Sequence, residues 1–196
     1  MINLMFDNGF KPFIRQSSCT EGGDALDQFM THVYNKVKSE FPQHEIETIH
    51  DSEMLVPGTP KVLVQIAAHV AGGAYYYQRS SVSKDIDPWD ESKTIYGVSI
   101  HPKYGGWFAM RGVIIFKDIL TPALPRKEPD DVVKGDEKKI DLLEKANFHW
   151  EDWSYRDVVP AVLKYSEEQK KYFATSPAKR KELLETYLQQ ENDPSL

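Results

Sequence analysis

The apolar residues of the segment 24–41 recur at steps of three and four, which is the spacing of one face of an α-helix. Asp24 stands before the first of them and is predicted to cap the helix N-terminus. The segment 44–51 (HEIETIHD) then predicts a short β-strand that ends near Asp51. The apolar helix face consists of Leu26, Phe29, Met30, Val33, Val37 and Phe41.

A second helix is predicted over 60–79, since Thr59 and Pro60 are a typical N-cap and first helical residue. Helical spacing would align its polar side chains in one stripe, made of Gln65, His69 and Tyr76.

The same segment contains the run AAHVAGGAYYYQR at 67–79. Gly72 and Gly73 have no side chains, so another surface could come close to the backbone there. Contact with a broad ligand is one interpretation. Helix packing, with His69 as a hydrogen-bonded core histidine, is the other.

A β-hairpin is predicted farther along the chain. It comprises a strand in 94–102 (TIYGVSIHP), a turn at KYGG and a return strand over 107–116 (WFAMRGVIIF). Strand alternation places Arg111 in the middle of an apolar face. A buried guanidinium requires an anion beside it, which is either an Asp or Glu of the chain or the carboxylate of a ligand.

The C-terminal part is predicted to be mostly helical. Residues 121–135 contain three prolines and predict a crossing loop, and 136–147 (DEKKIDLLEKAN) predict a helix. Ser166 begins a capping box, and Ser176-Pro177 begins the last helix. Helices and strands are interspersed, which indicates an α+β fold. Before Ser166, an aromatic cluster among acidic residues contains Trp150, Trp153, Tyr155 and Arg156.

Composition narrows the class of protein. The 196 residues suffice for one domain, and the net charge of −6 argues against a general attraction to nucleic acid. No apolar run approaches the roughly 18 residues that span a bilayer, so no membrane association is expected. The N-terminal sequence has no secretory pattern, and we therefore expect a cytoplasmic protein.

Cys19 is the only cysteine, which excludes an internal disulfide and a cysteine-based zinc site. The six histidines form no tight metal-binding pair, and the chain has neither a Walker loop nor a GxGxxG motif. For redox or thiol chemistry, the thiol must then come from outside the chain.

Long strings of the sequence resemble a known family. KVLVQIAAHVAGGAYYYQR, GVSIHPKYGGWFAMRG, NFHWEDWSYRDVV and YSEEQKKYFATSPAKR are similar, in this order, to the cobalamin-processing proteins defective in cblC-type methylmalonic aciduria with homocystinuria. The resemblance covers nearly the whole chain. It implies a fold related to flavin-dependent nitroreductases, with an antiparallel sheet, flanking helices and a C-terminal helical cap.

The resemblance also implies an activity. Family members bind cobalamin base-off, with the dimethylbenzimidazole tail displaced from cobalt. They transfer alkyl ligands to glutathione, release cyanide with electrons from a reduced flavin (FMN or FAD), and pass the product to a partner cobalamin-trafficking protein. The alternatives are a cobalamin carrier without turnover and a flavin reductase of the nitroreductase type.

Site residues follow from the matched positions. The family's glutathione pocket is built from three arginines, which match Arg111, Arg156 and Arg180. The resemblance assigns no acid–base residue and no metal ligand. Ser99 and Met110 stand where family members commonly have cysteine and isoleucine. His69 is added to the cobalamin site because it lies in the same segment and could bond to the ligand, with packing as its alternative role. The matched positions assign to this site Asp51, Val62, Leu63, Val64, Gln65, Tyr76, Tyr77, Gln78, Ser99 and Met110.

The resemblance suggests one cobalamin-processing domain over 1–196. Its parts would be a sheet-and-helix core over 1–120, a crossing loop over 121–135 and a helical cap over 136–196. Family members carry further residues, including sheet strands, before the segment that matches MFDNGFKPF. We therefore expect this chain to lack N-terminal strands of the fold, and flavin use is the activity that their loss would affect first.

Overall fold

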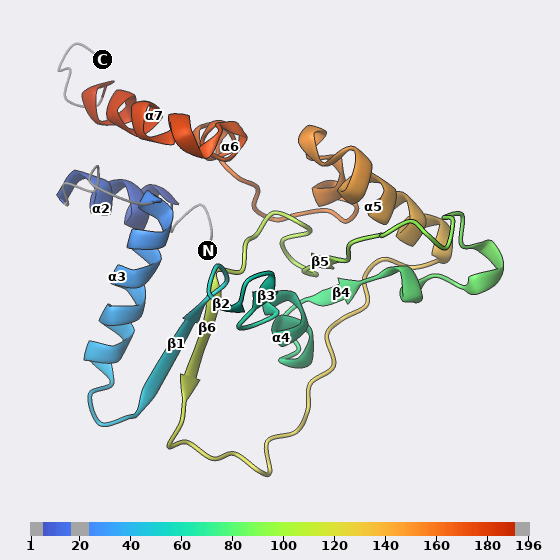
Figure 1. The fold of residues 1–196 in the computed structure, drawn as a ribbon, viewed down its shortest axis with the longest axis horizontal. Coiled ribbons are helices and arrows are strands. Elements are labelled where there is room, and N and C mark those ends of the chain that lie inside the picture. The colour runs from blue at the N-terminus through green and yellow to red at the C-terminus, as the bar shows by residue number, and fades with distance from the viewer. Residues whose placement is uncertain (1–5, 17–23, 191–196) are drawn as a thin grey trace. The chain divides into compact units, whose positions relative to one another are not determined.

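The computed structural model describes residues 6–16 and 24–190, which belong to two compact units (Figure 1). The first unit combines both ends of the chain, Met1–His44 and Tyr165–Leu196, and the second is the continuous segment Glu45–Lys164. These boundaries differ from the predicted core and cap, and the single domain stays a prediction.

The first unit is helical, and two of its helices begin at the predicted residues. The Asp24 side chain accepts a hydrogen bond from the amide of Leu26 at 2.8 Å, and that of Ser166 accepts one from the amide of Gln169 at 3.2 Å. Both N-caps are thereby confirmed. The elements are η1 (Phe6–Phe10), α2 (Lys11–Gln16), α3 (Ala25–Glu40), α6 (Glu167–Ala174) and α7 (Pro177–Gln190).

Aromatic rings fill the core of this unit. The ring centroid of Phe10 lies 5.7 Å from that of Phe29 and 5.4 Å from that of Tyr172, both in edge-to-face geometry. All three side chains are buried. Helices from the two ends of the chain therefore share one apolar core.

The second unit mixes helices with short strands, so the fold is mixed α/β. Within the described chain, the strands form three two-stranded antiparallel sheets. The paired strands are β1 (Ile46–His50) with β6 (Gly112–Phe116), β2 (Met54–Val56) with β3 (Thr59–Pro60), and β4 (Tyr75–Tyr77) with β5 (Val98–Ile100). The helical elements are α4 (Val64–Val70), η2 (Arg79–Ser81), η3 (Lys84–Ile86), α5 (Asp136–Phe148), η4 (Trp150–Asp152) and η5 (Ser154–Asp157). The relation to nitroreductases stays a prediction.

The predicted helix over 60–79 is wrong. Thr59 and Pro60 belong to β3, α4 covers only seven residues, and the three tyrosines form β4. The polar stripe of Gln65, His69 and Tyr76 on one helix face therefore does not exist.

Glycine ends the helix early. Gly72 has a φ of +71°, a conformation that costs glycine little. Its amide donates to the carbonyl of His69 at 3.0 Å, and the amide of Gly73 donates to the carbonyl of Ala68 at 2.8 Å. These two bonds are the Schellman arrangement of a helix C-terminus. The aromatic residues after the glycines favour a β-strand.

The predicted hairpin is wrong in its return strand. β5 pairs with β4, so that Ser99 lies opposite Tyr76, while residues 107–111 lie outside the strands. β6 begins only at Gly112 and pairs with β1. At the end of the turn, the amide of Gly106 donates to the carbonyl of Arg156 at 2.9 Å, so the chain follows that segment instead of returning along β5.

Tyr77 connects β4 to the end of a long loop. Its side chain is completely buried. The hydroxyl donates to Oδ1 of Asp131 at 2.7 Å and accepts hydrogen bonds from the amides of Val132 and Val133, each at 2.9 Å. Burial and the bond to Asp131 raise the pKa of this hydroxyl. Tyr77 therefore fixes the end of the loop 121–135 to the core.

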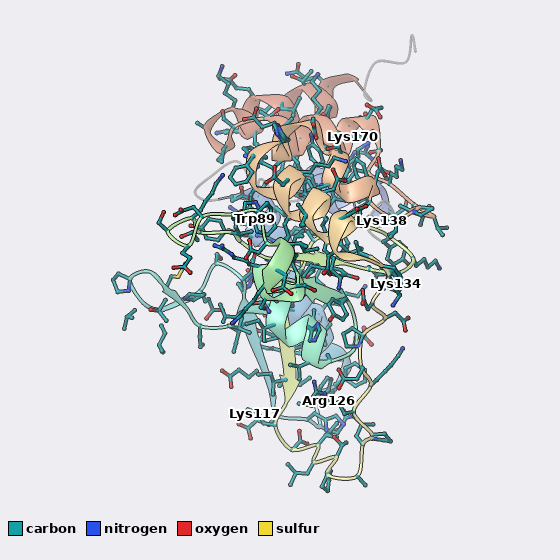
Figure 2. All side chains as sticks on the ribbon, turned by 90° about the vertical axis from the view of Figure 1, so that its right-hand side faces the viewer. Trp89, Lys117, Arg126, Lys134, Lys138 and Lys170 are labelled. Carbon is teal, nitrogen blue, oxygen red and sulfur yellow. The ribbon has the colours of Figure 1, made fainter. Side chains whose placement is uncertain are left out.

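Other predictions for the C-terminal part are confirmed. Residues 121–135 contain no helix or strand, and Figure 2 shows the Arg126 side chain on this loop. α5 begins at Asp136 and α7 at Pro177.

Among the described helices, none has the length and apolar character needed to cross a membrane. Cys19 lies outside the described residues.

Candidate functional site

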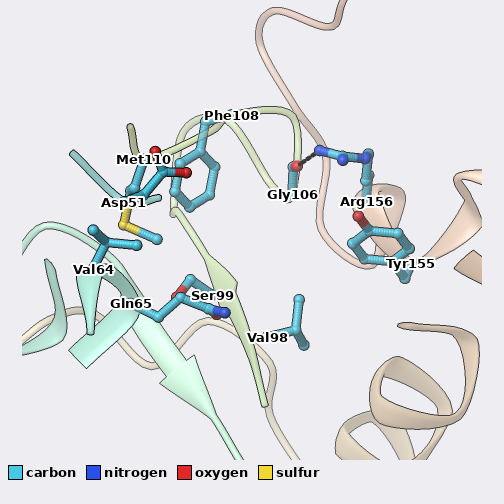
Figure 3. Close-up of a pocket in the computed structure, with 10 residues that line it drawn as sticks. All are labelled: Asp51, Val64, Gln65, Val98, Ser99, Gly106, Phe108, Met110, Tyr155 and Arg156. Atoms are coloured by element: carbon cyan, nitrogen blue, oxygen red, sulfur yellow. Dashed lines mark hydrogen bonds between the residues drawn. The ribbon is translucent and has the colours of Figure 1, made fainter. Parts of the chain in front are cut away.

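The second unit contains a pocket of about 310 Å³ (Figure 3). Its wall is built from five parts of the chain: the residue after β1, the start of α4, strand β5, the segment that begins with the last residue of the KYGG turn, and η5. The lining residues are Asp51, Val64, Gln65, Val98, Ser99, Gly106, Phe108, Met110, Tyr155 and Arg156.

Six of the ten lining residues are among those that the sequence singled out. The structure thus brings together residues that lie more than a hundred positions apart in the chain. Arg156 was matched to the glutathione pocket and the other five to the cobalamin site. The six are Asp51, Val64, Gln65, Ser99, Met110 and Arg156.

Asp51 forms an ion pair with Arg111. Its Oδ2 lies 3.2 Å from a terminal guanidinium nitrogen of Arg111, and its amide donates to the carbonyl of Arg111 at 3.1 Å. The anion beside Arg111 is therefore a carboxylate of the chain, which was one of the two interpretations of this arginine. Oδ1 of Asp51 is buried and accepts no hydrogen bond within the described residues. A ligand with an N–H or O–H group would satisfy this oxygen.

Gln65 and Ser99 form a polar pair on another part of the wall. The Ser99 hydroxyl donates to Oε1 of Gln65 at 3.1 Å. Ser99 is buried, which fixes the orientation of the Gln65 amide. The amide nitrogen of Gln65 makes no hydrogen bond in the described chain and can donate to an acceptor on a ligand.

Arg156 is held by its neighbours on several sides. Its guanidinium donates to the carbonyl of Gly106 and lies 4.8 Å from the ring centroid of Trp153 and 5.0 Å from that of Tyr155. The rings of Trp107 and Trp153 are stacked, with centroids 5.8 Å apart. Cation–π contacts of this kind fix an arginine while it keeps its charge.

The backbone beside Arg156 is strained. Trp153 has a φ of +64°, and it is the one non-glycine residue with a positive φ in the described chain. This conformation costs about 1–3 kcal/mol and is found preferentially at functional sites. The turn at Trp153 begins η5, which carries Tyr155 and Arg156 to the pocket wall.

Gly106 allows the close approach of Arg156. A Cβ at position 106 would lie 2.8 Å from the Cα of Arg156. We expect Gly106→Ala to lower the free energy of unfolding by about 1–3 kcal/mol, because the two segments must separate. Gly73→Ala is the matched control, since its Cβ would meet only the Ala68 carbonyl at 3.4 Å. Urea titration measures both variants, and equal midpoints would contradict the expectation.

Tyr77 has a structural role in this unit. Its side chain is completely buried and its hydroxyl is hydrogen-bonded internally, and its assignment to the cobalamin site stays a prediction. His69 has the structural role that was the alternative for it: its Nδ1 accepts a hydrogen bond from the amide of Tyr76 at 3.1 Å, and its ring packs on Tyr75. A contact of His69 with a ligand stays a prediction.

The other predicted residues lie away from the lining. Arg180 belongs to the first unit, where its guanidinium pairs with Asp24 at 3.2 Å and lies 5.0 Å from the Tyr172 ring centroid. The roles of all of them stay predictions. In the second unit, the residues outside the lining include Val62, Leu63, Tyr76, Gln78 and Arg111.

Sequence reasoning did not assign Val98, Gly106, Phe108 or Tyr155 to the site. Among these four residues, Tyr155 was the easiest to find from the sequence, because it belongs to the aromatic cluster around Arg156. Phe108 and Gly106 were placed in the hairpin that does not form, so their position on the wall was not predictable from it. No group of three or more His, Cys, Asp or Glu side chains that could hold a metal ion occurs in the described part of the chain.

A partly open pocket with opposite charges, an amide and apolar side chains, in a mixed α/β protein, is typical of sites that bind small molecules. The sequence profile of the methylmalonic aciduria and homocystinuria type C family matches residues 2–184. The chain therefore belongs to this family.

Relatives agree with this assignment. The chain is 49% identical over 180 residues to a cyanocobalamin reductase / alkylcobalamin dealkylase of Gallus gallus, and the match covers 92% of this chain and 74% of the relative. It is 47% identical to the Homo sapiens protein of the same name, and this match covers 92% of this chain and 63% of the human protein. The crystal structure of a Caenorhabditis elegans B12-trafficking protein, CblC, matches with a TM-score of 0.80 and 29% identity, covering 94% of this chain and 76% of that one.

Proposed function

We propose that this chain binds cobalamin base-off and removes its upper axial ligand. Alkyl ligands would pass to glutathione, and cyanide would leave on reduction. The observation that carries the proposal is the pocket of the second unit, which collects five residues matched to a cobalamin site and one matched to a glutathione site. The names of the chicken and human relatives support the same activity.

The chemistry of the wall fits cobalamin. Its corrin ring carries amide side chains, which offer both N–H donors and carbonyl acceptors. The unsatisfied Oδ1 of Asp51 fits a donor, and the amide nitrogen of Gln65 fits an acceptor. Cobalamin is much larger than the cavity of about 310 Å³, so the cavity would hold only the reacting part. Val62, Leu63, Tyr76 and Gln78 lie beyond the lining, where the rest of the molecule would extend.

Arg156 suits the carboxylates of glutathione. An arginine fork binds a carboxylate through two parallel hydrogen bonds, and the rings around Arg156 hold it in place. Arg111 would need to exchange its pairing with Asp51 for a ligand carboxylate, and Arg180 is assigned by the resemblance alone.

In the proposed transfer, the thiol first loses its proton to solvent. The thiolate sulfur then forms a bond to the alkyl carbon, the cobalt–carbon bond breaks, and its electron pair stays on cobalt as cob(I)alamin. The products are the glutathione thioether and the reduced cobalamin. The chain contributes by holding the sulfur close to the alkyl carbon and by excluding water. For decyanation, a reduced flavin would act as the electron-donating co-substrate, and no residue is assigned to it.

An absorbance titration tests the proposal. Purified protein is added to methylcobalamin, and glutathione follows in the absence of oxygen. A base-off shift and then thiol-dependent formation of cob(I)alamin are the expected results. A base-off shift without conversion would make the chain a carrier. No shift, together with stoichiometric bound flavin, would indicate a flavin reductase. Delivery to a trafficking partner and the cytoplasmic location stay predictions.

Asp51→Asn tests the cobalamin side of the pocket. The substitution keeps the shape of the side chain but replaces one acceptor by a donor, so the contact with a cobalamin amide would be lost. We expect the Kd for methylcobalamin to rise about tenfold or more, the effect of one charged hydrogen bond. Asp85→Asn, at an exposed position in η3, is the control. If Asp51→Asn binds like the unaltered chain, Asp51 serves only to pair with Arg111.

A further inference from the structure

The hydroxyl of Tyr155 is a polar group on the pocket wall. The proposed function uses it neither to bind carboxylates nor to bind cobalamin amides. Tyr155 lines the pocket, and its hydroxyl has no hydrogen bond to any described residue. In Figure 3 the hydroxyl lies on the side of the ring that faces Gly106 and Arg156. A polar atom in such a position is available to a ligand.

The ring of Tyr155 is fixed by its surroundings. One side packs against the buried cluster of the second unit, and the Arg156 guanidinium lies 5.0 Å from the ring centroid. The direction of the hydroxyl is therefore set before any ligand arrives. The buried cluster consists of Tyr77, Ile100, Val133 and Leu142.

The other polar groups of the wall are less suited to a negatively charged sulfur. Asp51 carries a negative charge and would repel it. The Ser99 hydroxyl already donates to Gln65, and the amide nitrogen of Gln65 donates to a cobalamin carbonyl in the proposed function. Arg156 supplies positive charge, and Tyr155 is the neutral donor next to it. Burial raises the pKa of the Tyr155 hydroxyl, although the charge of Arg156 opposes this, so the hydroxyl stays protonated at neutral pH.

We propose that the Tyr155 hydroxyl donates a hydrogen bond to the glutathione sulfur and, together with Arg156, favours its thiolate form in the pocket. This inference rests on the proposed function. A free thiol has a pKa of about 8.5, so only a small fraction is thiolate at pH 7. Donors beside the sulfur increase that fraction.

The hydrogen bond stabilises the thiolate more than it stabilises the transition state, because the negative charge leaves the sulfur as the carbon–sulfur bond forms. A thiolate whose pKa is lowered by one unit is about threefold less nucleophilic, since the Brønsted coefficient of thiolates is about 0.4–0.5. Tyr155 would therefore raise the rate where the thiol is mostly protonated and lower it where the thiol is fully ionised. This difference separates the proposed role from a structural one.

The pKa of the bound thiol also depends on the charges around the pocket. Asp51 and Arg156 lie on the wall, and Arg111 pairs with Asp51. Asp157 follows Arg156 and pairs with Lys164 at 2.8 Å, while Asp131 lies behind Tyr77. Tyr155→Phe leaves all these charges in place, so a change in the pH profile reports the hydroxyl alone.

The test is the pH dependence of methylcobalamin dealkylation by the full chain, measured without oxygen at saturating methylcobalamin and glutathione. In Tyr155→Phe we expect the inflection assigned to the thiol to move upward by about one pH unit, the effect of one hydrogen bond to a charged group. The rate at pH 7 should fall about threefold and the rate at high pH should rise about threefold, because the thiolate becomes less abundant but more nucleophilic. The Kd for methylcobalamin should stay unchanged.

Two results would overturn the inference. An unchanged inflection in Tyr155→Phe would show that the hydroxyl does not act on the sulfur. Weaker methylcobalamin binding with an unchanged inflection would place the hydroxyl on cobalamin instead. Tyr96→Phe is the control, since Tyr96 is 75% exposed and does not line the pocket. Failure of the proposed function is seen separately, as the absence of thiol-dependent conversion by the unaltered chain.

Discussion

Arg156→Ala is expected to lower thiol-dependent dealkylation of methylcobalamin about 10- to 100-fold at low glutathione, while the Kd for methylcobalamin changes little. The guanidinium is the positive charge on the pocket wall, and alanine cannot bind a carboxylate. The measurement is the initial rate against glutathione concentration, combined with an absorbance titration of cobalamin binding. Arg156→Lys keeps the charge but loses the fork, and it should give an intermediate rate.

The control for Arg156 is an arginine that is remote from the pocket. Arg126 lies on the loop 121–135 with its side chain 64% exposed, and Arg126→Ala should leave both properties unchanged. Because Arg156 also bonds the carbonyl of Gly106, its loss could disturb the fold. Circular dichroism and urea titration detect this. Equal loss of cobalamin binding and of glutathione use would contradict the separate role of Arg156.

Tyr77→Ala should have the largest effect on stability. It removes a completely buried ring and takes the hydroxyl away from Oδ1 of Asp131 and from the amides of Val132 and Val133. Loss of a large buried side chain costs about 3–5 kcal/mol, and the unsatisfied groups add to this cost. Urea titration should show a much lower midpoint or an unfolded protein. A change below about 1 kcal/mol would contradict the structural role of Tyr77.

Tyr77→Phe isolates the hydroxyl. We expect a loss of about 1–3 kcal/mol at neutral pH with cobalamin binding retained. Folding raises the pKa of Tyr77 above its ordinary value of about 10, chiefly through burial. Its contribution is therefore complete below pH 10 and is lost as the pH rises through the folded-state pKa. The stability difference between the two proteins should shrink above pH 10, and Tyr96→Phe should show no such trend.

The parts of the fold that were predictable depend on local signals. Asp24 and Ser166 cap their helices through hydrogen bonds to amides two or three residues away, and such caps are visible in the sequence. The predicted helix over 60–79 failed because the tyrosines pair with β5, more than twenty residues away, and because glycines end α4. Helical spacing carries no information about a strand partner.

The site was predictable only in part for a similar reason. The resemblance supplied Asp51, Gln65 and Arg156, and the structure brings them to one pocket. It did not supply Gly106 or Tyr155, whose positions depend on the contact between the KYGG segment and η5. Arg111 illustrates the limit of pattern reasoning, because the pattern required an anion but did not distinguish Asp51 from a ligand.

The contact between Gly106 and Arg156 also bears on how this pocket can evolve. The clash that a side chain at position 106 would create is with the Cα of residue 156, so no change of side chain at position 156 can relieve it. Position 106 therefore has to remain glycine as long as the backbone keeps this path. A change in ligand preference would instead involve the apolar side chains of the wall, which belong to Val64, Val98, Phe108 and Met110.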